Sequence, residues 1–380
     1  MKIYLVGGAV RDKLLGLPVN ERDWVVVGAT PEEMLTLSYQ QVGGNFPVFL
    51  HPDTKEEYAL ARTERKTGPG YKGFSFDFSA ITTLEEDLAR RDLTVNAMAE
   101  DSDGKLVDPF HGQRDLNDKI LRHVSDAFSE DPVRILRAAR FLARFKNLGF
   151  RIADETWQLM ADMVEAGETR NLVPERVWQE LQKALETANP ECFQQTLARC
   201  GALADVLPEL DSPAGEQCLT ALLQASRLSD DPIVRCAAWL APLETGQIES
   251  LCERLRVPKE YSALALLVHN NQGFFEDATQ LPPPQILAGL ERVDAFRRPE
   301  RFEQFLLAAE AVSRAKPGRA GWPHPQREYL HTALNQARAI TAKDLTKVRL
   351  EGKALAEELS LHRRAAISKI KRTYRWAKFD

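Results

Sequence analysis

Two hydrophobic spacings alternate along the first 108 residues, and this alternation predicts strands and helices in turn. The predicted strands are residues 2–6, 24–27, 41–50 and 56–63. Between the first two strands, Val10, Leu14 and Leu15 recur at helical spacing within residues 9–15. Thr30 followed by Pro31 is typical of a helix start, with threonine at the cap and proline at the first helical position. The pattern predicts a small mixed or antiparallel sheet with helices.

Strand signals almost vanish after about residue 115, and the rest of the chain predicts helices. Pro132, with acids before it, marks a helix start, and residues 181–380 form further helices broken by prolines, without an internal repeat. The fold class expected is therefore an α+β N-terminal head followed by an all-α neck, body and tail. The boundaries expected are 1–115 for the head, 116–180 for the neck, 181–325 for the body and 326–380 for the tail.

A glycine pair, Gly7-Gly8, ends the first strand and precedes the first helix. Glycines let the backbone approach a ligand, and the N–H groups at a helix start carry partial positive charge. A triphosphate could lie at this turn, with Arg11 clamping it. A structural turn without a ligand is the alternative.

Two carboxylates, Glu21 and Asp23, stand at the leading edge of the second strand, where a period of two puts both on one face. Like charges repel unless a cation lies between them, and Mg²⁺ is bound by one or two carboxylates together with substrate phosphates. The alternative is a solvated strand edge. The glycine turn just upstream favours the metal site.

The helix that begins after Pro132 carries Arg134, Arg137 and Arg140 along one flank. Such a stripe is usually a solvated face. However, an aspartate such as Asp131 can accept from the exocyclic amines of cytosine and adenine, and an adjacent arginine can donate to ring acceptors. Asp131 with Arg134 could therefore select C and A without a template.

Together these segments resemble the class II tRNA nucleotidyltransferases, the CCA-adding enzymes of the DNA polymerase β nucleotidyltransferase superfamily. Five stretches, four of them in the family's order and spacing, resemble the family's motifs A to E over nearly half of the chain. They are Leu5–Asp12 with Glu21-Arg22-Asp23, Arg90–Met98, Asp108–Gly112, Glu130–Arg134 and Glu175–Glu180.

The resemblance implies template-independent addition of CCA to tRNA 3′ ends from CTP and ATP. The tRNA 3′-hydroxyl would attack the α-phosphate, Mg²⁺ would assist, and pyrophosphate would leave. Glu21 and Asp23 would hold the metal, and Glu64 is a candidate third catalytic carboxylate. The implied nucleotide-binding residues are Gly8, Arg11, Arg91, Asn96, Asp131, Arg134, Arg137 and Arg140. Motif E would brace the neck helices.

The chain departs from the family's spelling at one position, because Glu21 stands where the first of two aspartates is usual. A non-catalytic RNA-binding relic with a spoiled metal site is therefore one alternative. A bacterial poly(A) polymerase, which shares the same head, and an enzyme that adds only CC or only A are the others. Residues 66–71 are expected to form a flexible loop, and residues 85–98 fit a helix imperfectly.

Composition places the chain among soluble cytoplasmic proteins. It has 380 residues, 44% hydrophobic and 28% charged, without a leader sequence or an apolar run long enough to span a membrane. The five cysteines lack a C-x-x-C pair, which predicts free, mostly buried thiols. The sequence does not predict the oligomeric state.

The second half predicts a body without phosphohydrolase chemistry and a tail that binds RNA. None of the seven histidines precedes an aspartate, so the metal-dependent phosphohydrolase site that some relatives carry is not expected. Basic residues with Tyr374 and Trp376 among them dominate residues 361–380. This mixture suits an RNA backbone, and a solubilising helix is the alternative.

Overall fold

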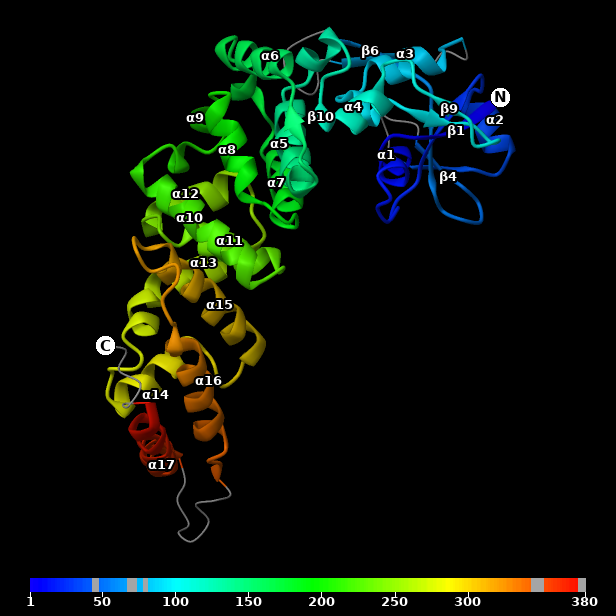
Figure 1. Cartoon of the computed structure of the whole chain (residues 1–380). Coiled ribbons are helices and arrows are strands. Elements are labelled where there is room, and N and C mark those ends of the chain that lie inside the picture. The colour runs from blue at the N-terminus through cyan, green and yellow to red at the C-terminus, as the bar shows by residue number, and fades with distance from the viewer. Residues whose placement is uncertain (43–47, 67–73, 78–80, 343–351, 375–380) are drawn as a thin grey trace. The chain divides into compact units, whose positions relative to one another are not determined.

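The computed structural model describes residues 1–42, 48–66, 74–77, 81–342 and 352–374 (Figure 1). The side chains of residues 63–66, 74–77 and 371–374 lie outside this description. The chain divides into two compact units, Met1–Val206 and Leu207–Asp380. The finer boundaries expected at residues 115, 180 and 325 stay predictions, and the expected loop at 66–71 lies outside the described residues except for Lys66.

The first unit contains a mixed sheet, as the sequence predicted. Among the described residues its strands follow the order β3-β4-β5-β2-β1-β8-β9, while β6 pairs with β7 and β10 with β11. The strands are β1 Lys2–Val6, β2 Asp23–Val27, β3 Gln40–Val42, β4 Val48–Leu50, β5 Glu57–Leu60, β6 Thr63–Lys66, β7 Phe74–Asp77, β8 Ala99–Glu100, β9 Leu106–Val107, β10 Ile120–Leu121 and β11 Arg151–Ile152.

Both faces of the central sheet are covered, which explains the uninterrupted apolar run in β2. Val25 packs in one core cluster with Val6, and its neighbour Val26 packs in a second cluster with Phe49. Successive residues of a strand point to opposite faces, so a run of valines fits a strand that is buried on both sides. β2 pairs antiparallel with β1 and parallel with β5.

Two of the predicted strands were wrong in extent. Residues 41–50, expected as one strand, contain β3 and β4, which pair antiparallel with Val42 opposite Val48. Residues 56–63, expected as one strand, contain β5 and only the first residue of β6, and these two strands belong to different sheets. The chain leaves the central sheet at Arg62, whose N–H donates to Asp87 Oδ1 at 3.4 Å.

The helices of the first unit lie beside the sheet and continue past it, as Figure 1 shows in blue through green. They are α1 Gly8–Leu14, α2 Pro31–Thr36, α3 Leu84–Ala89, α4 Gly112–Asp118, α5 Val133–Phe145, α6 Asp154–Glu165, α7 Pro174–Leu185, α8 Glu191–Arg199 and α9 Leu203–Val206. Shorter 3₁₀ turns are η2 Thr94–Asn96, η3 Asp126–Glu130, η4 Lys146–Leu148 and η5 Glu168–Asn171. α5 packs against α7 and α8.

The imperfect helix expected over residues 85–98 is divided in the structure. α3 ends at Ala89 and only the turn η2 follows. Between them Leu93 bridges to His123, and Thr94 N–H donates to the Arg122 carbonyl at 2.8 Å. Pairing with residues 122–124 therefore replaces the helical hydrogen bonds.

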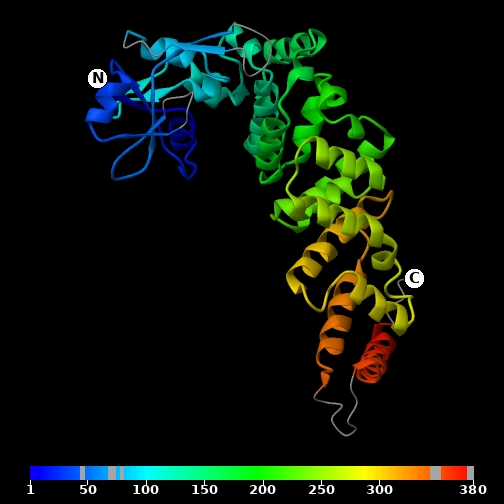
Figure 2. The same ribbon diagram turned by 180° about the vertical axis from the view of Figure 1, so that it is seen from behind.

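The second unit is helical in its described residues, and Figure 2 shows it from the opposite side in green through red. Its elements are η6 Pro208–Leu210, α10 Pro213–Leu228, α11 Pro232–Leu240, α12 Thr245–Arg254, α13 Lys259–Glu276, α14 Pro283–Arg292, α15 Pro299–Ala315, α16 Pro325–Arg338 and α17 Gly352–Tyr374. Prolines stand at the first turns of α10, α11, α14, α15 and α16, where a missing N–H costs nothing.

The core of the second unit forms where α10, α11, α13 and α15 pack together, while α17 packs on α14 and α16. α11 is apolar around most of its circumference and is almost wholly buried. All five cysteines are free and buried, as predicted. Every helix in the described part of the chain is too short or too polar to cross a lipid bilayer.

Candidate functional site

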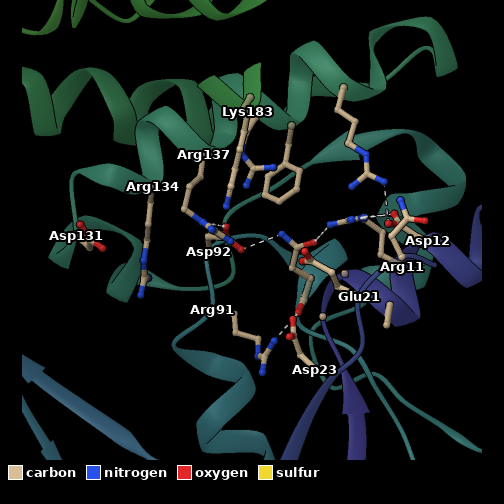
Figure 3. A pocket seen from close by; sticks show the side chains of 18 of the residues that line it. Arg11, Asp12, Glu21, Asp23, Arg91, Asp92, Asp131, Arg134, Arg137 and Lys183 are labelled. Carbon is tan, nitrogen blue, oxygen red and sulfur yellow. Dashed lines mark hydrogen bonds and ion pairs between the residues drawn. The ribbon is translucent and has the colours of Figure 1, made fainter. Parts of the chain in front are cut away.

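One pocket of about 1010 Å³ in the first unit brings together residues that the sequence placed in separate motifs (Figure 3). Its lining includes the predicted site residues Gly8, Arg11, Glu21, Asp23, Arg91, Asn96, Asp131, Arg134, Arg137 and Arg140. Residues from the predicted motifs A, B and D therefore line one cavity. Glu64 lies on β6, but its side chain is outside the described part of the structure.

The glycine turn that follows β1 lies close to Arg91 of motif B. Gly7 has φ +67° and ψ −125°, a backbone conformation that residues with a side chain rarely adopt. A Cβ at this position would stand 2.8 Å from Nη1 of Arg91. The close approach of Arg91 to the turn thus depends on glycine, and it brings a guanidinium beside the backbone of Gly7.

The two acids lie at the start of β2, a central strand of the sheet. Asp23 is the first residue of β2, whereas Glu21 lies two residues before the strand begins, and both are exposed in the pocket (Figure 3). Partial loss of hydration raises the pKa of Asp23, the charge of Glu21 raises it further, and Arg91 and Arg137 oppose both effects. Within the described residues, no cluster of three or more His, Cys, Asp or Glu side chains forms a metal site.

The donor set of this acidic pair fits a hard divalent cation. Two carboxylates supply oxygen ligands, and the pocket leaves the remaining positions to water and substrate phosphates. A cation at the pair would also relieve the repulsion that raises the Asp23 pKa.

Motif B supplies two arginines held by one buried acid. Asp87 accepts from Nη2 of Arg90 at 2.6 Å and from Nη2 of Arg91 at 3.2 Å. Burial alone would raise the pKa of Asp87, but the two guanidinium groups lower it. Nε of Arg91 is buried and has no hydrogen-bond partner among the described residues.

Asn96 and Asp92 link motif B to the neighbouring elements. Asn96 Oδ1 accepts a short hydrogen bond from Nη1 of Arg11, and its amide donates to Asp92 Oδ1 at 3.0 Å. Asp92 Oδ2 accepts from Nε of Arg137 at 2.6 Å. Asp92 is buried, which alone would raise its pKa, but Arg137 and Asn96 hold it well below the usual range.

Arg11 is packed more deeply than a solvent-facing clamp would be. Its guanidinium lies 5.0 Å from the ring centres of both Phe141 and Phe145, and Nη2 lies 2.8 Å from Asp12. Burial lowers the pKa of Arg11 to about 10, against the attraction of Asp12. Arg11 therefore joins α1 to α5 in addition to lining the pocket, and its contact with a triphosphate stays a prediction.

The start of α5 carries the residues expected to recognise the base. Asp131 is bound by both terminal nitrogens of Arg176 on α7, at 3.1 and 2.7 Å. Arg134 donates to the carbonyls of Ala127 and Arg90, at 2.8 and 2.5 Å. Figure 3 shows Arg134 and Arg137 projecting from α5 into the pocket.

Sequence reasoning missed several partners of the predicted residues. Arg144 donates to Asp12 at 2.8 Å, and Arg140 donates to Glu180 at 2.5 Å. Two residues of α7 also pair across to neighbouring segments: Arg176 with Asp131 in the turn before α5, and Glu180 with Arg140 on α5. Buried charges in a helix that packs against another are the signal that points to such partners.

Two family models and a curated relative match this chain. The family model described as "Poly A polymerase head domain" matches residues 3–122, and the model described as "Probable RNA and SrmB- binding site of polymerase A" matches residues 149–212. The "Multifunctional CCA protein" of Thioalkalivibrio sulfidiphilus (strain HL-EbGR7) is 52% identical, over 98% of this chain and 99% of that protein.

Two solved structures share the fold. The Bacillus stearothermophilus CCA-adding enzyme in complex with CTP has a TM-score of 0.67 at 25% identity, covering 97% of this chain and 89% of that chain. The Thermotoga maritima CCA-adding enzyme complexed with tRNA has a TM-score of 0.67 at 21% identity, covering 98% and 91%. Since the identity to a multifunctional CCA protein extends over nearly the full length of both chains, this chain belongs to the class II CCA-adding enzymes, the tRNA nucleotidyltransferases with a poly(A) polymerase head.

Proposed function

We propose that the pocket of the first unit is where this chain adds CCA to tRNA 3′ ends from CTP and ATP, with release of pyrophosphate. The observation that carries the proposal is the convergence of Glu21, Asp23, Asp131 and Arg134 in one cavity. The acids belong to the start of β2 and the segment before it, whereas Arg134 belongs to the first turn of α5 and Asp131 to the turn before that helix. A nucleotide can therefore reach both sets at once.

Glu21 and Asp23 hold the divalent metal that this family typically uses, and Mg²⁺ is the ion we assign. When bound, Mg²⁺ lowers the pKa of the attacking hydroxyl and neutralises charge on the phosphate oxygens. Glu21 retains the carboxylate of the usual aspartate on a side chain that is one methylene longer. Glu64 is retained as a candidate third carboxylate.

The arginines neutralise and orient the triphosphate. Arg91 stands beside the glycine turn, and its buried Nε has a hydrogen to donate. Gly8 offers backbone without a side chain, and we assign Asn96 to the sugar. Arg137 and Arg140 continue the positive charge along α5. Asp131 accepts from the exocyclic amine of C or A, and Arg134 donates to a ring acceptor.

tRNA is the second substrate, and the basic helix α17 is the surface that we assign to its backbone. Arg364 and Lys369 are exposed on this helix, whereas Arg363 lies 4.6 Å from the ring centre of Phe296. Residues 375–380, which the sequence included in the basic tail, lie outside the described residues. We place the protein in the cytoplasm, where tRNA is processed.

The test is product analysis on tRNA that lacks its CCA end, supplied with CTP alone, ATP alone and both. Asp23→Asn should lower the rate by about three orders of magnitude or more, because a metal ligand is lost. Asp103→Asn, on an exposed turn of the same unit, is the matched control and should leave the rate unchanged.

The product pattern separates the alternatives. Addition of two residues with CTP alone and three with both nucleotides supports the proposal. A long A tail would identify a poly(A) polymerase, and a single type of addition would identify a CC-only or A-only enzyme. If the wild-type chain adds no nucleotide and Glu21→Asp does, the natural protein is a non-catalytic relic. Full activity in Asp23→Asn would refute the two-carboxylate site.

A further inference from the structure

We propose that Arg176 is a positioning residue that sets nucleotide selection by fixing the carboxylate of Asp131. The inference rests on the proposed role of Asp131 in reading the base. Arg176 belongs to α7 and Asp131 to the turn before α5, so the contact joins two helices across the rim of the pocket. It lies within the predicted motif E, which sequence reasoning treated only as a brace.

The backbone around Asp131 gives its carboxylate one hydrogen bond, which does not fix the orientation of the group. Asp131 follows the turn η3, and its Oδ1 accepts from Val133 N–H at 3.1 Å. One hydrogen bond leaves the carboxylate able to rotate. The two bonds from Arg176 have the parallel geometry in which a planar guanidinium fixes both position and orientation of a carboxylate.

These contacts also determine which oxygen remains available to a base. An ionised carboxylate has about four lone-pair positions. Oδ1 receives two donors, Val133 N–H and Nη1 of Arg176, whereas Oδ2 receives only Nη2 of Arg176 among the residues that the structure describes. The open acceptor position is therefore on Oδ2, and the exocyclic amine of the incoming base would bind there.

Arg134, the other half of the base-recognition pair, is held by two contacts outside α7. The carbonyls of Ala127 and Arg90 hold its guanidinium, and neither belongs to α7. Loss of Arg176 should thus loosen the acceptor and leave the donor in place. Uracil and guanine present a carbonyl oxygen where cytosine and adenine present an amine, and a fixed acceptor repels that oxygen. A mobile acceptor can move aside.

The experiment measures kcat and KM of the full chain for CTP, ATP, UTP and GTP on tRNA without its CCA end. Arg176→Gln should lower the ratio of kcat/KM for CTP over UTP, and for ATP over GTP, by about tenfold to a hundredfold. The KM for CTP should rise more than kcat falls. Arg176→Lys, which keeps the charge but not the planar fork, should fall between wild type and Arg176→Gln.

Arg170→Lys is the matched control, because Arg170 pairs with Asp205 on the exposed side of the same unit, with a side chain that is 73% exposed. Its selectivity should equal that of wild type. Equal losses of kcat/KM for all four nucleotides in Arg176→Gln, with unchanged ratios between nucleotides, would show that Arg176 only braces the helices and would overturn the inference. If Arg176→Gln does not fold by its thermal transition, unchanged ratios in Arg176→Lys overturn it instead.

Asp131→Ala separates this inference from the proposed function. If Asp131→Ala retains full selectivity, Asp131 does not read the base and both proposals fail at this residue. If Asp131→Ala loses selectivity while Arg176→Gln keeps it, only the role of Arg176 is refuted. Loss of selectivity in both variants supports the two together.

Discussion

The glycine turn shows how a single residue makes room for a functional side chain. Gly7→Ala should lower the stability of the first unit by about 1–3 kcal/mol, because an alanine at φ +67° is strained. Its Cβ should also displace Arg91 and raise the KM for CTP. Thermal unfolding and steady-state kinetics measure the two effects separately.

Gly16→Ala is the control for backbone strain alone. Gly16 also has a positive φ, +68°, but a Cβ there would meet no atom within 4 Å. It should lower stability by about 1 kcal/mol and leave the KM for CTP unchanged. An equal rise of KM in both variants would show that Arg91 is not displaced.

Asp92 gives the first unit a stability that depends on pH. Its folded-state pKa lies below that of the unfolded chain, so its contribution is present above the unfolded value of about 4 and is lost as pH falls. Asp92→Asn should therefore be less stable than wild type by about 2–3 kcal/mol at pH 7. The difference should shrink below about pH 5.

Thermal unfolding of both proteins between pH 3.5 and 7 measures that difference, with Asp103→Asn as an exposed control. A gap that stays constant over this range would mean that folding does not lower the pKa of Asp92.

At this scale the sequence predicted which residues line the pocket but not how they are paired. The motif residues could be placed because each motif is a local pattern. The pairs Arg137–Asp92 and Arg144–Asp12 join residues 45 and 132 positions apart, and no spacing rule connects such segments. Periodicity gives the face of a helix, whereas a partner depends on the packing of distant elements.

The pair of helices α5 and α7 is held by charges that are buried between them. Glu180 is 5% exposed, accepts from Arg140 at 2.5 Å and lies 3.9 Å from Arg137. Glu180→Ala should destabilise the first unit by about 3 kcal/mol, because it leaves an arginine buried without its partner. Glu165→Ala, on the exposed side of α6, should change stability by less than about 0.5 kcal/mol.

Denaturant unfolding followed by circular dichroism compares the two variants. A change in Glu180→Ala no larger than that of Glu165→Ala would mean that the arginines find water or other acceptors. Glu180→Gln, which keeps one acceptor oxygen, should lie between wild type and Glu180→Ala.

Elements with a clear start and stop signal were predicted within about one residue, and the others were not. α2 begins at Pro31, as the Thr30-Pro31 pair predicted, and Thr30 forms a capping box with Glu33. β3 and β4 were predicted as one strand because β-forming residues lie on both sides of Gly43-Gly44-Asn45, although this tripeptide is typical of a turn. The helical prediction for residues 85–98 was wrong beyond Ala89, because pairing with residues 122–124 overrides local helical preference.

The division into two units implies that the molecule unfolds in more than one step, and the buried cysteines can report each step. Cys192 and Cys200 belong to the first unit, whereas Cys218, Cys236 and Cys252 belong to the second. Burial raises the pKa of each thiol, so both low exposure and low thiolate content slow its reaction while the unit is folded.

Alkylation during stepwise heating, read by mass spectrometry, should modify the two sets at different temperatures. Saturating CTP with Mg²⁺ should raise the temperature for Cys192 and Cys200, because the pocket lies in their unit. Labelling of all five at one midpoint, shifted together by CTP, would instead show a single cooperative molecule.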